Sequence, residues 1–102
     1  MTSPANGQQP SFQVTLAGQA QQTIKESHQY AAELGQGKQF LDSLRFVYAR
    51  LRTDPHSFGE PLFRLPTLKL LVACAIVPPV IVHYGVHQEE PLVIIRHVRF
   101  LG

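Results

Sequence analysis

Apolar and polar residues alternate near the start of the chain and then follow a helical repeat. In residues 11–16 every second position is apolar, which is the period-two pattern of a strand with one buried face. Apolar positions at helical spacing follow in residues 17–34, which end at Gly35, and again in residues 38–52. The chain is therefore expected to begin with a strand and two helices, and the short glycine-rich link favours a helical hairpin.

β-branched and aliphatic runs dominate the second half of the chain. They predict three strands at residues 68–77, 80–87 and 92–101, separated by Pro78-Pro79 and by the polar residues 88–91. Short connections imply antiparallel neighbours, so residues 62–101 form a meander. The predicted fold class is α+β, in the order β-α-α-β-β-β. The helical hairpin packs on one face of a small, mostly antiparallel sheet, which the first strand rejoins after the hairpin.

The alternation in the strand at residues 80–87 separates two faces. Its even positions suit the face covered by the helices: Val80, Val82, Tyr84 and Val86. The odd positions then lie on the open face: His83, Gly85 and His87. We expect a functional site on this open face.

Length and composition indicate one ordinary globular domain. The 102 residues are 44% apolar and 16% charged, which suits a single domain at residues 11–102 after a flexible tail at residues 1–10. A lone cysteine, Cys74, allows no intrachain disulfide, so the cytoplasm is the default location. The longest apolar run contains Pro78 and Pro79 and is too short to span a bilayer. No membrane association is therefore expected.

The charge balance is mildly basic. Nine Lys and Arg against seven Asp and Glu give a net charge of +2, which neither requires nor excludes a polyanionic partner. The meander carries four cations: Arg64, Lys69, Arg96 and Arg99. Gathered on the open face they could bind an RNA backbone, and the alternative is that they are scattered solubilising charges.

A second set of cations follows one edge of the second predicted helix. Lys38, Arg45 and Arg52 are spaced by seven residues, which places them in a row beside the apolar stripe. This row could contact phosphates or an acidic partner. The alternative is a solvated flank, with Asp42 available to pair with two of the three.

The histidines suggest proton transfer rather than metal binding. His83 and His87 lie four residues apart on one predicted strand, with His97 on the next. Strand residues at that spacing are separated by about 13 Å, whereas two nitrogens on one zinc lie within about 4 Å. We therefore expect no metal site and no cofactor. One histidine could act as a proton-transfer group, and the alternative is a solvated strand residue.

Several segments together resemble the RelE/ParE superfamily of toxins from type II toxin–antitoxin systems. The resemblance covers residues 12–101 and rests on five segments: the first strand at residues 12–16, the second helix from residues 37–40 through 51–55, Gly59 after it, the strand at residues 82–86 with Tyr84, and the last strand at residues 94–98 with Arg96. It implies a compact toxin that cuts mRNA on the ribosome or inhibits gyrase. A small antitoxin would neutralise it.

The resemblance also implies roles for individual residues. The candidate catalytic residues are Arg64, Arg96 and His97; the candidate nucleic-acid contacts are Lys69, Arg99 and His83; the candidate antitoxin contacts are Lys38, Arg45 and Arg52. Two family features are changed, because Pro79-Val80 replaces an arginine before the Tyr strand and Arg99 replaces a histidine after the last arginine. A second hypothesis is therefore a diverged, non-catalytic member that binds a protein partner or a second copy of itself.

Overall fold

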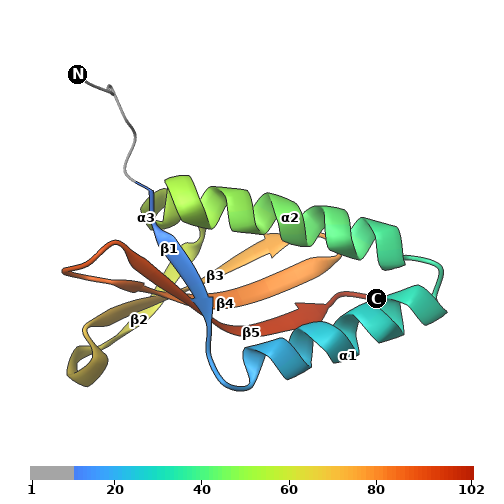
Figure 1. Ribbon diagram of the computed structural model, residues 1–102, viewed down its shortest axis with the longest axis horizontal. Helices are drawn as coiled ribbons and strands as arrows, with labels where there is room; N and C mark the ends of the chain where they lie inside the picture. The colour runs from blue at the N-terminus through green and yellow to red at the C-terminus, as the bar shows by residue number, and fades with distance from the viewer. Residues whose placement is uncertain (1–10) are drawn as a thin grey trace.

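The computed structural model describes residues 11–102, and the predicted tail at residues 1–10 lies outside the described residues. A five-stranded sheet in the order β1-β5-β4-β3-β2 is covered on one face by two helices (Figure 1). The elements are β1 (Gln13–Leu16), α1 (Ala20–Glu33), α2 (Gly37–Thr53), α3 (Pro55–Phe58), β2 (Glu60–Leu65), a 3-10 turn (Pro66–Leu68), β3 (Leu70–Val77), β4 (Val80–His87) and β5 (Leu92–Phe100). The predicted α+β fold class is confirmed.

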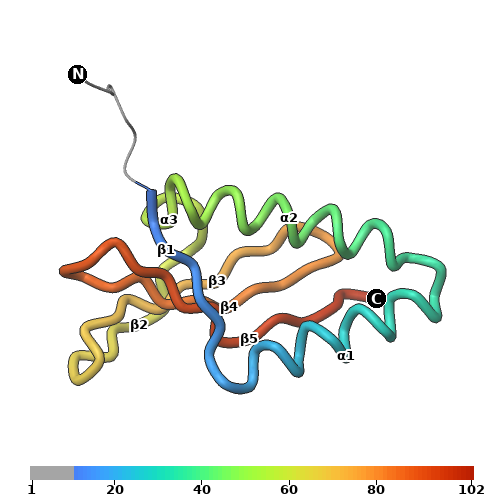
Figure 2. The backbone as a smooth tube through the Cα atoms, in the orientation of Figure 1, coloured from blue at the N-terminus to red at the C-terminus, as the bar shows by residue number. Residues whose placement is uncertain are grey.

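The first strand rejoins the sheet as predicted. β1 pairs in parallel with β5, from Gln13 opposite Leu92 to Leu16 opposite Ile95. All other neighbouring strands are antiparallel. The backbone path in Figure 2 leads from β1 through a turn into α1 and returns along α2. The connection from β1 to the rest of the sheet is therefore the helical hairpin itself.

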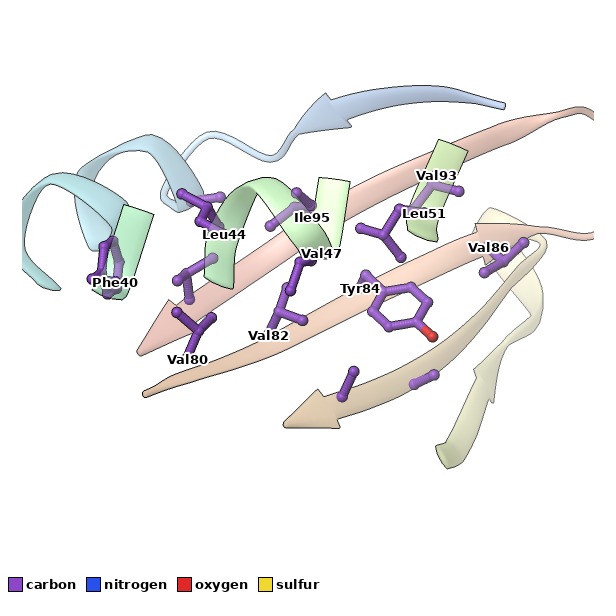
Figure 3. Close-up of a cluster of buried hydrophobic side chains, with 14 of the residues drawn as sticks. Phe40, Leu44, Val47, Leu51, Val80, Val82, Tyr84, Val86, Val93 and Ile95 are labelled. Carbon is purple, nitrogen blue, oxygen red and sulfur yellow. The ribbon is translucent and has the colours of Figure 1, made fainter. Parts of the chain in front are cut away.

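The core lies between α2 and the centre of the sheet. Four apolar residues one helical turn apart face the sheet: Phe40, Leu44, Val47 and Leu51. They meet the even-numbered side chains of β4, which are buried as the alternation predicted: Val80, Val82, Tyr84 and Val86 (Figure 3). Burial of this apolar area is the main source of stability, and it fixes which face of the sheet stays open.

The meander has four strands instead of the three expected. β2 begins at Glu60 and pairs antiparallel with β3, with a register shift between Pro61 and Phe63. The predicted strand at residues 68–77 starts only at Leu70, because Pro66–Leu68 forms a 3-10 turn and Lys69 adopts a left-handed φ of 54°. The short helix α3, with Pro at its first position, was also not predicted. The last two strands match their predicted positions to within one residue.

The helix boundaries differ slightly from those expected. Ala17 donates its backbone N–H to the carbonyl of Ile95, so it continues the pairing of β1 and the helix starts only at Ala20. α2 ends at Thr53, next to Asp54 and the predicted stop at Pro55. In residues 11–102, no helix is long and apolar enough to cross a membrane.

Candidate functional site

Two histidines face each other across adjacent strands on the open face of the sheet. His83 on β4 is paired in register with His97 on β5. The ring centroids are 6.2 Å apart and the rings are tilted by 50°. His83 points away from the core because its chain neighbours Val82 and Tyr84 are fully buried under the helices.

A β-bulge in β5 adds Arg96 to this pair. His83 lies opposite His97, but the next residue, Tyr84, lies opposite Ile95, so Arg96 is the extra residue. Arg96 and His97 are therefore consecutive residues between the buried Ile95 and Val98, and both lie outside the core. Bulges of this kind redirect side chains at functional sites.

Arg99 completes the cluster, which we call the His–Arg site: His83, Arg96, His97 and Arg99. Arg99 is paired with Ile81 on β4 and lies two residues beyond His97, so the alternation places it on the same face. Arg96 and Arg99 are exposed, and within residues 11–102 neither takes part in an ion pair. The site is thus cationic and open to an anion.

His83 is held in its neutral form. Burial lowers the pKa of His83, and the nearby His97, Arg99 and Arg96 lower it further. Its Nδ1 is buried and has no hydrogen-bond partner in the described part of the chain. A proton on this imidazole would add another positive charge beside Arg96 and Arg99, so the imidazole is neutral at pH 7.

The third strand contributes a thiol. Cys74 on β3 is paired with His83, which gives the order Cys74, His83, His97 across the sheet. Burial raises the pKa of Cys74, and the charge of Glu60 raises it further. The thiol therefore stays protonated and is a poor nucleophile. In the described residues no group of three or more His, Cys, Asp or Glu side chains could hold a metal ion.

The remaining predicted residues of the meander lie elsewhere. Arg64 on β2 is opposite Leu71, which is opposite the buried Val86, so its register position belongs to the other face of the sheet. Lys69 sits in the turn before β3, with its Nζ 3.0 Å from a carboxylate oxygen of Glu89. The structure therefore brings together Arg96, His97, Arg99 and His83, but not Arg64 or Lys69.

His87, which was expected on the open face, binds the backbone of the turn that follows β4. Its Nδ1 accepts hydrogen bonds from the backbone N–H groups of Glu89 and Glu90, each at 3.1 Å. These bonds close the turn between β4 and β5, so this side chain has a structural task.

One carboxylate balances part of the charge of the predicted row on α2. Lys38 and Arg45 both contact the carboxylate of Asp42, at 2.9 and 3.2 Å. Arg52 instead borders an open hollow of about 390 Å³ lined also by Tyr48 and by residues 11–14. This row is a flank of the helix, separate from the His–Arg site.

The sequence did not reveal an apolar surface beside β2. A hollow of about 380 Å³ is lined by Phe58, Gly59, Glu60, Leu62, Cys74, Ala75 and Ile76. Leu62 and Ile76 at its edge are 48% and 61% exposed, and Phe46, in ring contact with Phe58, is 50% exposed. The adjacent apolar pair Leu62-Phe63 was the only signal of it in the sequence. We call Phe46, Phe58, Leu62 and Ile76 the β2 apolar surface.

Comparison with known proteins gives matches only among solved structures. No protein-family model and no curated protein matches the sequence. The toxin–antitoxin complex RelBE2 from Mycobacterium tuberculosis matches with a TM-score of 0.63 and 16% identity, over 93% of this chain and 97% of the other. The archaeal RelE–RelB complex from Pyrococcus horikoshii OT3 matches with a TM-score of 0.57 and 17% identity, over 90% and 97%. The chain therefore has the RelE fold, as its resemblance to the RelE/ParE superfamily predicted.

Proposed function

We propose that this chain is the toxin of a type II toxin–antitoxin pair and that it acts by cleaving mRNA. The observation that supports RNA as the target is the His–Arg site. Two exposed arginines outside any ion pair in residues 11–102 flank a pair of histidines on one face. Guanidinium groups bind phosphate oxygens well, and imidazoles transfer protons near neutral pH.

The same observation makes gyrase inhibition the weaker alternative. A gyrase inhibitor needs only a surface that fits its protein target. Binding a protein target does not require a proton-transfer group, whereas bond cleavage at a phosphodiester needs both proton transfer and stabilisation of negative charge.

A small antitoxin is the proposed partner. The two solved structures compared above are complexes, one the toxin–antitoxin complex RelBE2 and the other a RelE–RelB complex. In this chain the β2 apolar surface exposes large apolar side chains, including Leu62 and Ile76, of the kind that a partner chain covers. The role of Lys38 and Arg45 as partner contacts is less favoured, because Asp42 already binds both.

Expression in bacteria tests the proposal. The wild-type chain should arrest growth, and co-expression of the short gene beside its own should restore it. The double variant Arg96→Ala/Arg99→Ala should be harmless. The matched control Lys38→Ala/Arg45→Ala removes the same charge from the α2 flank and should remain toxic.

Cleavage is measured directly by mapping the ends of ribosome-bound mRNA after adding purified protein. New ends should appear with the wild type and with the control variant. Harmless expression of the wild type, together with intact ribosome-bound mRNA, would overturn the proposal. Growth arrest with intact mRNA and inhibited supercoiling would instead favour gyrase as the target.

A further inference from the structure

We propose that His83 and His97 divide the two proton transfers of RNA cleavage between them, His83 acting as the general base and His97 as the general acid. This inference rests on the proposed function. Cleavage of RNA without an external nucleophile needs one group that removes the proton of the 2′-hydroxyl and another that protonates the departing 5′-oxygen. The two histidines are the groups at the His–Arg site that can do this.

The geometry allows both rings to reach one phosphodiester. His83 and His97 are register partners on adjacent strands, with ring centroids 6.2 Å apart. Within the described chain their rings are not hydrogen-bonded to each other, so each ring can bind a ligand. Groups on either side of one phosphate can serve its attacking and departing oxygens. Arg96 and Arg99 lie on the same face and can bind its other oxygens.

His83 is suited to be the base because it is neutral. The groups facing it are His97, Arg96 and Arg99 from β5 and Cys74 from β3. The first three disfavour a positive charge on its ring, and Cys74 remains an uncharged thiol. Glu60 lies one strand further away, opposite Cys74. Since Nδ1 is buried, Nε2 is the ring nitrogen left to take the substrate proton.

His97 is assigned as the acid by comparison with its neighbours. Arg96 and Arg99 keep their protons at all relevant pH values, because a guanidinium is not deprotonated in proteins. They can stabilise charge but cannot act as acids. His97 is the remaining group of the His–Arg site that can give up a proton and take one back.

The step balances without a further reactant. The 2′-oxygen attacks phosphorus and its proton passes to His83. The bond from phosphorus to the 5′-oxygen breaks, and that oxygen takes a proton from His97. The products are a 2′,3′-cyclic phosphate and a 5′-hydroxyl, while Arg96 and Arg99 stabilise the negative charge that develops on the phosphoryl oxygens. Exchange with water returns both histidines to their starting states.

The first test compares three variants in single-turnover cleavage of ribosome-bound mRNA. His83→Asn and His97→Asn should each lower the rate by about 100-fold or more. His56→Gln, which removes an exposed histidine from α3, should stay within about twofold of the wild type, a difference too small to reflect proton transfer. Binding of ribosome-bound mRNA with a 2′-deoxy nucleotide at the cleavage site should be unchanged, which shows that the variants are folded.

The second test separates the two roles. An mRNA with sulfur in place of the 5′-bridging oxygen has a leaving group that needs no acid. This substrate should restore the rate of His97→Asn but not that of His83→Asn. In the wild type, cleavage should be lost as the pH falls through the lowered pKa of His83, below about 6.5, and this acid limb should disappear in His83→Asn.

The outcomes separate this inference from the proposed function. If the wild type cleaves mRNA but both variants keep their rates to within about threefold, a change too small for a lost proton-transfer group, the inference is wrong and the proposed function stands. Rescue of His83→Asn by the sulfur substrate would overturn the assignment of roles. If the wild type leaves mRNA intact, both the inference and the proposed function fail.

Discussion

At the residue scale, Tyr84 connects the core to the short helix beside the sheet. Its ring is fully buried. Its hydroxyl donates a hydrogen bond to the carbonyl of Pro55 at 3.1 Å and accepts one from the backbone N–H of Gly59 at 2.8 Å. Pro55 is the first residue of α3 and Gly59 follows its last, so one side chain of β4 fixes both ends of this helix.

We expect Tyr84→Phe to destabilise the fold by about 1–3 kcal/mol, because it leaves a carbonyl and an N–H without partners. The packing of the ring is kept, so the loss reflects the hydrogen bonds. Urea denaturation followed by circular dichroism measures the change. Tyr30→Phe is the matched control, since Tyr30 is 53% exposed and should change stability little. Equal stability of the two variants would contradict the role given to the hydroxyl.

At the element scale, Gly59 is the point where α3 passes into β2. A Cβ atom at this position would lie 2.5 Å from the Tyr84 hydroxyl and 2.8 Å from the carbonyl oxygen of Cys74. The backbone of Cys74 cannot move without disturbing β3. Glycine is therefore required here by close packing rather than by backbone conformation.

The variant Gly59→Ala should cost about 1–3 kcal/mol, the usual range for an overpacked site, and should lower the thermal unfolding midpoint. Gly18→Ala offers the matched control, because nothing lies within 4 Å of a Cβ placed there. That control should keep wild-type stability. If Gly59→Ala were as stable as the control, the surrounding structure could shift to accommodate the added methyl group. That result would contradict the requirement for glycine at this position.

The sequence predicted the elements that bury an apolar face and missed those that do not. β4 alternates regularly because one of its faces is buried, and its bounds were predicted correctly. β2 is an edge strand whose first five residues are exposed, so burial imposes no alternation on it. Pro61 and the register shift beside it obscure the pattern further. A strand of this kind is recognised only from its pairing with the neighbouring strand.

The same reasoning applies to the candidate site. The residue types were apparent, since histidines and arginines on a predicted open face suggest proton transfer and phosphate binding. Their convergence depends on the bulge at Arg96. The buried positions of β5 step from Ile95 to Val98, a gap of three where strict alternation gives two. This gap was the signal of a bulge in the sequence. Without knowledge of which residues pair across the strands, it could not be distinguished from the end of a strand.

At the scale of the whole molecule, cations on the two faces of the sheet differ in whether a carboxylate lies beside them. On the helical side, the hydrogen bond from Lys38 and the charges of Lys38 and Arg45 lower the pKa of Asp42, against the opposing effect of burial. Asp42 therefore stays ionised and balances part of that charge. On the open face, Arg96 and Arg99 have no such carboxylate partner within residues 11–102. Two of the cations outside ion pairs in residues 11–102 thus lie together on the open face.

This difference predicts how RNA binding responds to salt. Each contact to a single-stranded phosphate adds about 0.7 to the slope of log K against log salt concentration, so loss of two contacts should lower the slope by roughly 1.4. Arg96→Ala/Arg99→Ala should show this loss with a 2′-O-methyl RNA oligonucleotide, which lacks the attacking hydroxyl. Lys38→Ala/Arg45→Ala changes the net charge equally and should keep the wild-type slope. Fluorescence anisotropy from 50 to 300 mM salt measures both. Equal losses in the two variants would mean that RNA responds to net charge alone, and the open face would then have no special part in binding.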